Sequence, residues 1–208
     1  MVTTTAPFPV ALILAAGRSS RTAPAHKLLA PDAAGRAMLV RTTHHVLGSN
    51  VGQVLVVVPP DKPELQSLLQ DAFPHTEKLG FCVAQDAALG LSASLRAGVK
   101  AAEKLGASSV LVCLGDMPLV STELLNSLLA EQNRMKASAV APDRGGRAGN
   151  PVVWDKSQFP ALKQVEGDKG GRAILQKLGC AVHLVPAPLQ ELVDFDTPER
   201  LAAYARLG

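Results

Sequence analysis

A chain of 208 residues that is 47% hydrophobic and 19% charged carries enough apolar side chains to bury one sizeable core. Its formal net charge of +3 is too small to indicate nucleic-acid binding, and its Lys and Arg residues form no stripe with interleaved aromatic residues, which make up only 3% of the chain. Its apolar runs all fall short of the roughly 20 residues that a membrane-spanning helix needs. Composition therefore favours a globular protein with neither nucleic acid nor membrane as a partner.

Short apolar runs that end at turn residues alternate with stretches of helical periodicity along most of the chain. The strongest strand signals are 10–16, which ends at Gly17, and 110–114, which ends at Gly115-Asp116. In chain order we predict a strand at 10–16, a helix at 38–47, a strand at 54–58, a helix at 64–73, a strand at 81–84, a helix at 91–105, a strand at 110–114, a helix at 121–134, a strand at 137–141, a glycine-rich loop at 143–150, a helix at 170–178, a strand at 182–185 and a helix at 197–207.

This alternation predicts an α/β fold, with a Rossmann-like, mostly parallel sheet and helices on both faces. Right-handed crossovers bring the carboxyl ends of the strands to one edge, where ligands bind in such sheets. We predict a flexible lead-in over residues 1–9 and a single domain over 10–208. The lead-in lacks the basic region of a signal peptide, and Cys82, Cys113 and Cys180 are expected to be buried, reduced thiols. A cytoplasmic location follows as the default.

The turn after the first strand carries residues suited to phosphate. Ala15, Ala16 and Gly17 are small enough for a ligand to approach the backbone, whose N–H groups can form an anion-binding concavity. Arg21 and Lys27 follow and could neutralise a triphosphate. The alternative is an ordinary strand-to-helix turn with a solvated basic loop. The segment matches neither the P-loop pattern nor the dinucleotide fingerprint.

Two acidic segments could supply metal ligands. Asp116 follows the end of the predicted strand 110–114, where it points to the ligand edge of the sheet. Magnesium usually takes one or two protein carboxylates as ligands. The second segment holds Asp194 and Asp196, which lie on the same side if the chain is extended there. One of them could join Asp116 on a metal. The alternatives are a turn role for Asp116 and capping of the last helix by Asp196 or Thr197.

Taken together, these segments resemble a known family, the molybdenum cofactor cytidylyltransferases among the MobA-like nucleotidyltransferases. The resemblance runs from about residue 10 to the C-terminus. Its motifs are the Leu14-Ala15-Ala16-Gly17 turn with Ser19, Arg21 and Lys27, then Gly90-Leu91-Ser92-Ala93-Ser94-Leu95, Gly115-Asp116-Met117-Pro118, Gly149-Asn150-Pro151, Gly167-Asp168-Lys169-Gly170-Gly171-Arg172 and Asp194-Phe195-Asp196-Thr197-Pro198. Their order and joint presence carry the resemblance, since each one alone is a weak signal.

The resemblance implies a single-domain nucleotidyltransferase fold and a role for each segment. It implies that CTP is bound by Leu14, Ala15, Ala16, Gly17, Arg18 and Ser19, with Arg21 and Lys27 on its phosphates, and by Gly90, Leu91, Ser92 and Ser94 on the base and ribose side. Asp116 and Asp196 would hold Mg²⁺, with Arg21, Lys27 and Asp116 as the catalytic residues. Gly149, Asn150, Asp168 and Arg172 would face the acceptor, a molybdopterin phosphate.

Several alternatives stay open from the sequence. Cytidylyl members carry Ala-Ala-Gly where guanylyl members carry Ala-Gly-Gly, which favours CTP over GTP. The acceptor could instead be a sugar phosphate or methylerythritol phosphate, or the chain could be a non-catalytic molybdenum cofactor carrier. A molybdoenzyme of the xanthine dehydrogenase type is the implied client. The chain departs from its relatives between Arg21 and Lys27, where Thr22-Ala23-Pro24 replaces Met-Gly and leaves open which phosphate Lys27 contacts. The Arg144–Arg147 loop could be a solvated surface or a lid over the acceptor.

Overall fold

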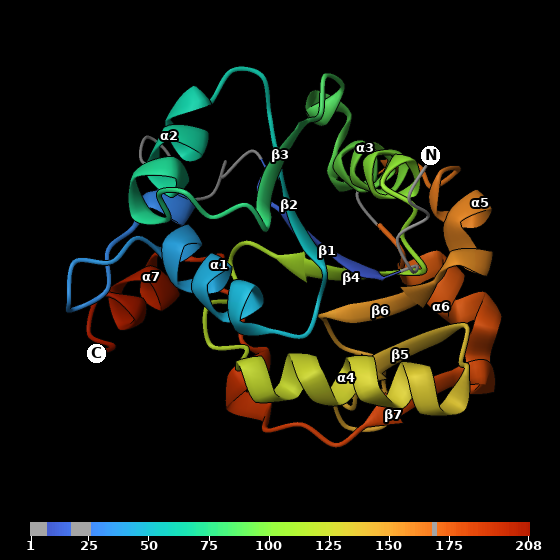
Figure 1. Ribbon diagram of the computed structural model, residues 1–208. Coiled ribbons are helices and arrows are strands. Elements are labelled where there is room, and N and C mark those ends of the chain that lie inside the picture. Colours follow the sequence, from blue (N-terminus) through green and yellow to red (C-terminus); the bar gives the residue numbers. More distant parts are fainter. Residues whose placement is uncertain (1–7, 18–25, 168–169) are drawn as a thin grey trace.

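The computed structural model describes residues 8–17, 26–167 and 170–208 (Figure 1). Its strands are β1 (Pro9–Leu14), β2 (Gln53–Val58), β3 (Leu79–Val83), β4 (Ser109–Leu114), β5 (Ala139–Pro142), β6 (Val152–Asp155) and β7 (Val182–Val185). Its α-helices are α1 (Met38–Gly48), α2 (Pro63–Ala72), α3 (Leu91–Lys104), α4 (Thr122–Met135), α5 (Phe159–Leu162), α6 (Arg172–Leu178) and α7 (Pro198–Tyr204). The 3-10 turn η1 (Lys27–Leu29) precedes α1.

The described strands form one seven-stranded sheet in the order β3-β2-β1-β4-β6-β5-β7. Its neighbouring strands run parallel, except that β6 is antiparallel to both β4 and β5. Leu14, the last residue of β1, lies opposite Val57 of β2 and Leu114 of β4. The predicted α/β, mostly parallel sheet is therefore confirmed, and the turns that follow β1 and β4 leave the sheet at the same edge.

Side chains of β1 alternate between two hydrophobic cores, one on each face of the sheet. Ala11 and Ile13 pack with α1, α2, α4 and α7, whereas Leu12 and Leu14 pack with α3, α5 and α6. Figure 1 shows these helices on both sides of the strands. Because both faces of β1 are buried, its sequence is a continuous apolar run rather than an alternating one.

The sequence prediction lacks the four-residue helix α5, and it also lacks strand β6. Strand β6 contains only four residues and follows a glycine-rich loop, so no periodicity could develop, and it runs against β4 rather than continuing the strand–helix alternation. Helix α6 begins at Arg172 rather than at residue 170, since Gly170 has a positive φ of 51° and Gly171 is the N-cap. Helix α7 ends at Tyr204, three residues earlier than predicted.

The three cysteines are free, but they differ in exposure. Cys113 lies buried in β4, and burial raises the pKa of its thiol to about 12, so it stays protonated. Cys82 is half-buried, whereas Cys180 is exposed in the turn after α6. The prediction of three buried thiols is therefore wrong for Cys180, which lies in the turn between α6 and β7, and it holds only in part for Cys82.

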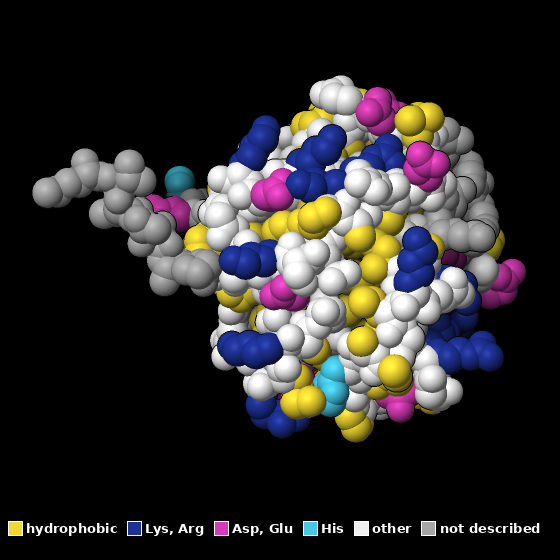
Figure 2. Space-filling model, turned by 90° about the vertical axis from the view of Figure 1, so that its right-hand side faces the viewer, with side chains coloured by type: hydrophobic (Ala, Val, Ile, Leu, Met, Phe, Trp, Pro, Cys, Tyr) yellow, Lys and Arg dark blue, Asp and Glu magenta, His cyan; other side chains and the backbone are white. Residues whose placement is uncertain are grey.

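The surface formed near α5 and α6 is shown in Figure 2. Lys and Arg side chains are dispersed over this face, with acidic, hydrophobic and uncharged groups between them. None of the helices within the described ranges combines the length and apolarity that crossing a bilayer requires.

Candidate active site at the carboxyl edge of the sheet

The turns after β1 and β4 lie side by side at the carboxyl edge of the sheet. The amide of Gly115 donates a hydrogen bond of 3.1 Å to the carbonyl oxygen of Leu14. Ala15 and Ala16 are buried, whereas Gly17 is exposed, and a Cβ added to Gly17 would meet no described atom within 4 Å. Within the described residues, the side of Gly17 on which a side chain would stand is therefore unobstructed.

Gly115 is the point at which three neighbouring segments meet. A Cβ at this position would lie 3.2 Å from the carbonyl oxygen of Leu14, 3.2 Å from Leu28 Cδ1 and 3.3 Å from Leu39 Cδ1. The hydroxyl of Thr42 in α1 donates to the Gly115 carbonyl at 3.0 Å. Since Leu28 is packed directly over this glycine, η1 is fixed against the end of β4, which brings Lys27 next to Asp116.

Lys27 joins Asp116 and Asp196. Its Nζ atom lies 2.5 Å from Asp116 Oδ2 and also donates a hydrogen bond to Asp196 Oδ1. The side chains of Lys27 and Asp116 are each 13% exposed, and that of Asp196 is 30% exposed. The two carboxylates that the sequence analysis assigned to one metal therefore converge on one cationic group at the carboxyl edge.

The shifts in pKa at this cluster follow from burial and from the neighbouring charges. Burial lowers the pKa of Lys27, but the two carboxylates raise it more, so the net shift is upward and the ammonium stays charged. For Asp116, burial and the nearby Asp196 carboxylate raise the pKa, while Lys27 lowers it, and the net shift is again upward. Removing the cation would thus leave two carboxylates in mutual repulsion.

Asp194, Asp196 and Thr197 each contact a different hydrogen-bonding or ion-pairing group. Thr197 is the N-cap of α7, and its hydroxyl oxygen accepts from the amide of Arg200. Asp194 forms an ion pair with Arg200 at the surface. The two aspartates therefore contact different partners, and Thr197 rather than Asp196 caps the helix.

A second cluster forms where α3 begins. Gly90 is the N-cap of α3 with a φ of 102°, and Leu91 packs against Gly170. Ser92 and Ser94 are buried, and the Ser92 hydroxyl donates to the carbonyl oxygen of Gly167. The sequence analysis assigned the residues from Gly90 to Ser94 and the segment from Asp168 to Arg172 to different ligands. The structure brings Gly90–Ser92 together with Gly167 and Gly170, with Ser92 engaged in holding that segment.

The glycine-rich loop becomes a hairpin between β5 and β6. Asp143 and Ala148 form an antiparallel bridge, and the Gly149 amide donates to the Pro142 carbonyl at 2.9 Å. Asn150 is exposed and precedes Pro151 through a cis peptide bond. The side chains of Arg144 and Arg147 are exposed at the tip, and Arg172 is exposed at the start of α6. Arg144, Arg147 and Asn150 belong to the connection that leaves the carboxyl end of β5, on the edge that carries Asp116.

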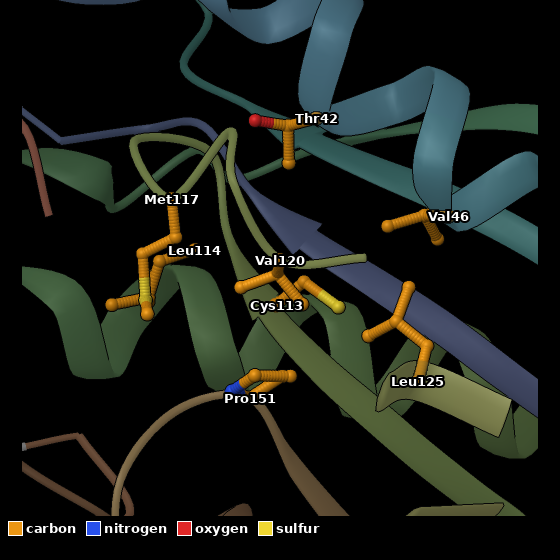
Figure 3. A pocket seen from close by; sticks show the side chains of 8 residues that line it. All are labelled: Thr42, Val46, Cys113, Leu114, Met117, Val120, Leu125 and Pro151. Atoms are coloured by element: carbon orange, nitrogen blue, oxygen red, sulfur yellow. The ribbon is translucent and has the colours of Figure 1, made fainter. Parts of the chain in front are cut away.

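A small cavity lies behind the turn that carries Asp116 (Figure 3). Its volume is about 10 Å³, and its lining consists of Thr42, Val46, Cys113, Leu114, Met117, Val120, Leu125 and Pro151. Figure 3 shows Pro151 approaching the end of β4 from the hairpin side. Because small-molecule sites usually occupy several hundred Å³, this cavity cannot hold a nucleotide. It shows instead that the Gly149–Pro151 turn packs against the Asp116 turn.

Comparisons with known proteins identify the family of this chain. Residues 11–182 match the MobA-like NTP transferase domain. The chain is 31% identical over 197 residues to the purine catabolism protein PucB of Bacillus subtilis, covering 93% of this chain and 94% of that protein. It belongs to the MobA-like NTP transferase family. A more distant relative is the phosphoenolpyruvate guanylyltransferase of Sphaerobacter thermophilus, 28% identical over 86% of both chains.

Solved structures share the fold of this MobA-like domain. A nucleotidyl transferase from Methanothermobacter thermautotrophicus superposes with a TM-score of 0.81 at 24% identity, over 96% of this chain and 97% of that one. Rv0371c from Mycobacterium tuberculosis, in a complex with manganese, gives a TM-score of 0.73 at 20% identity over 95% and 98%. The predicted single-domain nucleotidyltransferase fold is confirmed by these neighbours.

The family implies a divalent metal, and the residues present fit one. Within the described ranges no group of three or more His, Cys, Asp or Glu side chains could hold a metal ion. Asp116 and Asp196 nevertheless supply two carboxylates to one cation, the donor number and type that Mg²⁺ takes when waters and substrate phosphates complete its shell. The chemistry of these two carboxylates therefore fits a divalent metal.

Some predicted site residues have no structural account. Arg18, Ser19, Arg21 and Asp168 lie outside the described residues, as does most of the predicted lead-in over 1–9. His26 comes next to Lys27, and both of its ring nitrogens are buried without a hydrogen-bond partner among the residues that the structure describes. Burial and the charge of Lys62 lower the pKa of His26, so its ring is neutral at pH 7. The orphaned nitrogens of His26 are a feature that the sequence pattern gave no signal for.

Proposed function

We propose that this MobA-like NTP transferase moves the cytidylyl group of CTP onto the terminal phosphate of molybdopterin and releases pyrophosphate. The observation that carries the proposal is the convergence of Asp116 and Asp196 on one cation, next to the open Gly17 turn. Nucleotide transfer needs charge neutralisation at such a point and little covalent chemistry from the protein. The sequence Ala15-Ala16-Gly17 supports CTP as the donor through its resemblance to cytidylyl members.

The proposed reaction is an in-line displacement at the α-phosphorus of CTP. An oxygen of the acceptor's phosphate forms the new bond as the bond to pyrophosphate breaks. A phosphate monoester is already an anion at neutral pH, so no side chain has to remove a proton. The backbone at Gly17 would hold the triphosphate, and Arg21 and Lys27 would neutralise its charge.

Asp116 and Asp196 would hold Mg²⁺, which supplies charge neutralisation for the phosphate oxygens when it is bound. The manganese complex of Rv0371c, a protein of the same fold, supports a divalent ion for this domain. We propose that the Gly149–Asn150 turn, Asp168 and Arg172 face the acceptor, with Gly90 and Leu91 on the nucleotide side. The arginines of the 143–150 hairpin are exposed at the same edge, where an anionic acceptor would meet them.

The client of the product is proposed to be a molybdoenzyme of the xanthine dehydrogenase type. The relative from Bacillus subtilis is named a purine catabolism protein, which agrees with a client that oxidises purines.

A cytoplasmic location stays a prediction. The guanylyltransferase relative keeps GTP as the alternative donor, and a phosphorylated acceptor other than a pterin is the alternative substrate.

One assay separates these possibilities. Pyrophosphate release is measured with each of the four nucleoside triphosphates and Mg²⁺, without an acceptor and with molybdopterin, a sugar phosphate or methylerythritol phosphate, and pterin binding is measured alongside. The proposal expects release with CTP only when molybdopterin is present. Release with GTP would identify GTP as the donor. Release with a sugar phosphate or methylerythritol phosphate would identify that compound as the acceptor. Tight pterin binding without pyrophosphate release would identify a carrier and contradict the enzyme.

A further inference from the structure

The position between Asp116 and Asp196 is held by a charged group of the protein itself. The Nζ atom of Lys27 contacts Asp116 Oδ2 at 2.5 Å and also bonds to Asp196 Oδ1. All three side chains are largely buried, so water does not screen this contact well. The ammonium therefore takes the place that a cation shared by the two carboxylates would take.

A divalent ion and this ammonium exclude each other. A metal ion bound by both carboxylates would sit within about 2.0–2.6 Å of their oxygens, which is the space that Nζ fills. Two cations at that separation also repel strongly where water is scarce. Metal binding through both carboxylates thus requires Lys27 to leave.

Only the side chain of Lys27 is free to make this movement. Its backbone belongs to η1, where the amides of Leu29 and Ala30 bond back to His26 and Lys27, and Leu28 is packed against Gly115. A lysine has a flexible stem of four carbons, so its ammonium can turn away while the backbone stays in place. The turn at Gly17 leaves the same edge of the sheet, and the triphosphate proposed to bind there would offer the ammonium a new anionic partner.

We infer that the Lys27 ammonium and the divalent metal are alternative occupants of the position between Asp116 and Asp196, so that metal and nucleotide bind cooperatively. The inference rests on the proposed function, because it needs a metal at these carboxylates. Without nucleotide, the metal has to displace an ion pair and binds weakly. With nucleotide, the phosphates receive the displaced ammonium, and the metal binds more tightly. Linkage requires that the metal strengthen nucleotide binding by the same factor.

The test measures the affinity of the full chain for Mn²⁺ in the absence of nucleotide, with electron paramagnetic resonance to detect the bound ion. Lys27→Met removes the ammonium and keeps much of the apolar stem, and we expect it to bind Mn²⁺ at least tenfold more tightly than the wild-type protein. Lys163→Met is the matched control, because Lys163 pairs with Glu103 at the surface, and it should bind like the wild type. Adding CTP should tighten binding by a larger factor in the wild type than in Lys27→Met.

Equal or weaker Mn²⁺ binding by Lys27→Met, with binding by the wild type intact, would overturn the inference and leave the proposed metal site standing. No Mn²⁺ binding by any variant, with or without CTP, would overturn both. A second measurement avoids substitution at Lys27. In the wild-type chain, acylation of Lys27 by an N-hydroxysuccinimide ester, measured by peptide mass spectrometry relative to Lys163, should become faster when Mn²⁺ is added. An unchanged ratio would contradict the displacement.

Discussion

The backbone amide of Phe195 donates a hydrogen bond of 3.0 Å to the carbonyl oxygen of Asp116. This bond joins the segment before α7 to the turn after β4 and places Asp196 beside Asp116, although the two aspartates are far apart in the sequence. The side chain of Phe195 is buried and anchors the same segment in the core. Its ring packs edge-on against the ring of Tyr204, with 5.3 Å between the ring centroids. The pairing of the two carboxylates is therefore a consequence of how the C-terminal segment packs.

The first prediction concerns the carboxylate of Asp116. Asp116→Ala should lower the rate of pyrophosphate release by about 100-fold or more, since losing one charge contact at a transferring phosphoryl group raises the barrier by about 3 kcal/mol. The protein should stay folded, because the Phe195 bond uses the backbone of residue 116. Steady-state kinetics and circular dichroism check both parts. A variant that turns over at a near-normal rate would remove Asp116 from the proposed mechanism.

The second prediction concerns the space at Gly115. Gly115→Ala should destabilise the fold by about 1–3 kcal/mol, because the new methyl group would press on Leu14, Leu28 and Leu39. Urea unfolding measures the change in the free energy of unfolding. Gly208→Ala is the control, since a Cβ there meets no described atom within 4 Å. If Gly115→Ala were as stable as Gly208→Ala, the packing of η1 over this glycine would not be the constraint described above.

The third prediction concerns acid stability and Asp32. This buried carboxylate accepts from the amides of Ala34 and Arg36 and pairs with the guanidinium groups of Arg36 and Arg41. Burial raises the pKa of Asp32, but the hydrogen bonds and charge of Arg36 lower it more, so the folded pKa lies below the ordinary value. The unfolded chain therefore binds more protons in acid, and the stability that ionised Asp32 contributes is present above about pH 4 and lost as the pH falls through the folded pKa.

Asp32→Asn should accordingly be less stable than the wild type at pH 7, and its stability should change less between pH 5 and acid. Urea midpoints across that range measure the slope, with Asp71→Asn, an exposed position in α2, as the control. A variant with the same acid slope as the wild type would show that the Asp32 network does not govern acid unfolding.

The fourth prediction concerns thiol reactivity. In the folded chain, maleimide should modify the exposed Cys180 first, the half-buried Cys82 more slowly, and Cys113 only after unfolding, because burial raises the pKa of Cys113 to about 12 and removes it from solvent. Peptide mass spectrometry over time gives the three rates, and Cys180→Ser should lose the fastest phase. Rapid labelling of Cys113 in the native protein would contradict its burial.

The fold was predictable wherever both faces of a strand are buried, since runs such as Val10–Ala16 and Val110–Leu114 are continuous and are followed by glycine. The motifs at Gly17 and Asp116 could be placed on one edge by the rule that parallel strands share their carboxyl ends, whereas the position of Asp196 beside Asp116 depends on how the C-terminal segment packs. The bridging position of Lys27 could not be predicted, because it depends on how Leu28 packs over Gly115. The burial of Ser92 was likewise hidden, since it depends on contact with Gly167, which is distant in the sequence.

Mn²⁺ affinity in the presence of CTP, compared between Asp196→Asn and Asp194→Asn, tests most directly whether Asp116 and Asp196 share a divalent ion. The two substitutions remove the same charge two residues apart, but Asp196 contacts Lys27 and Asp194 contacts Arg200. We expect Asp196→Asn to bind Mn²⁺ at least tenfold more weakly than the wild type, and Asp194→Asn to bind it normally. Equal affinity for both variants would contradict the account.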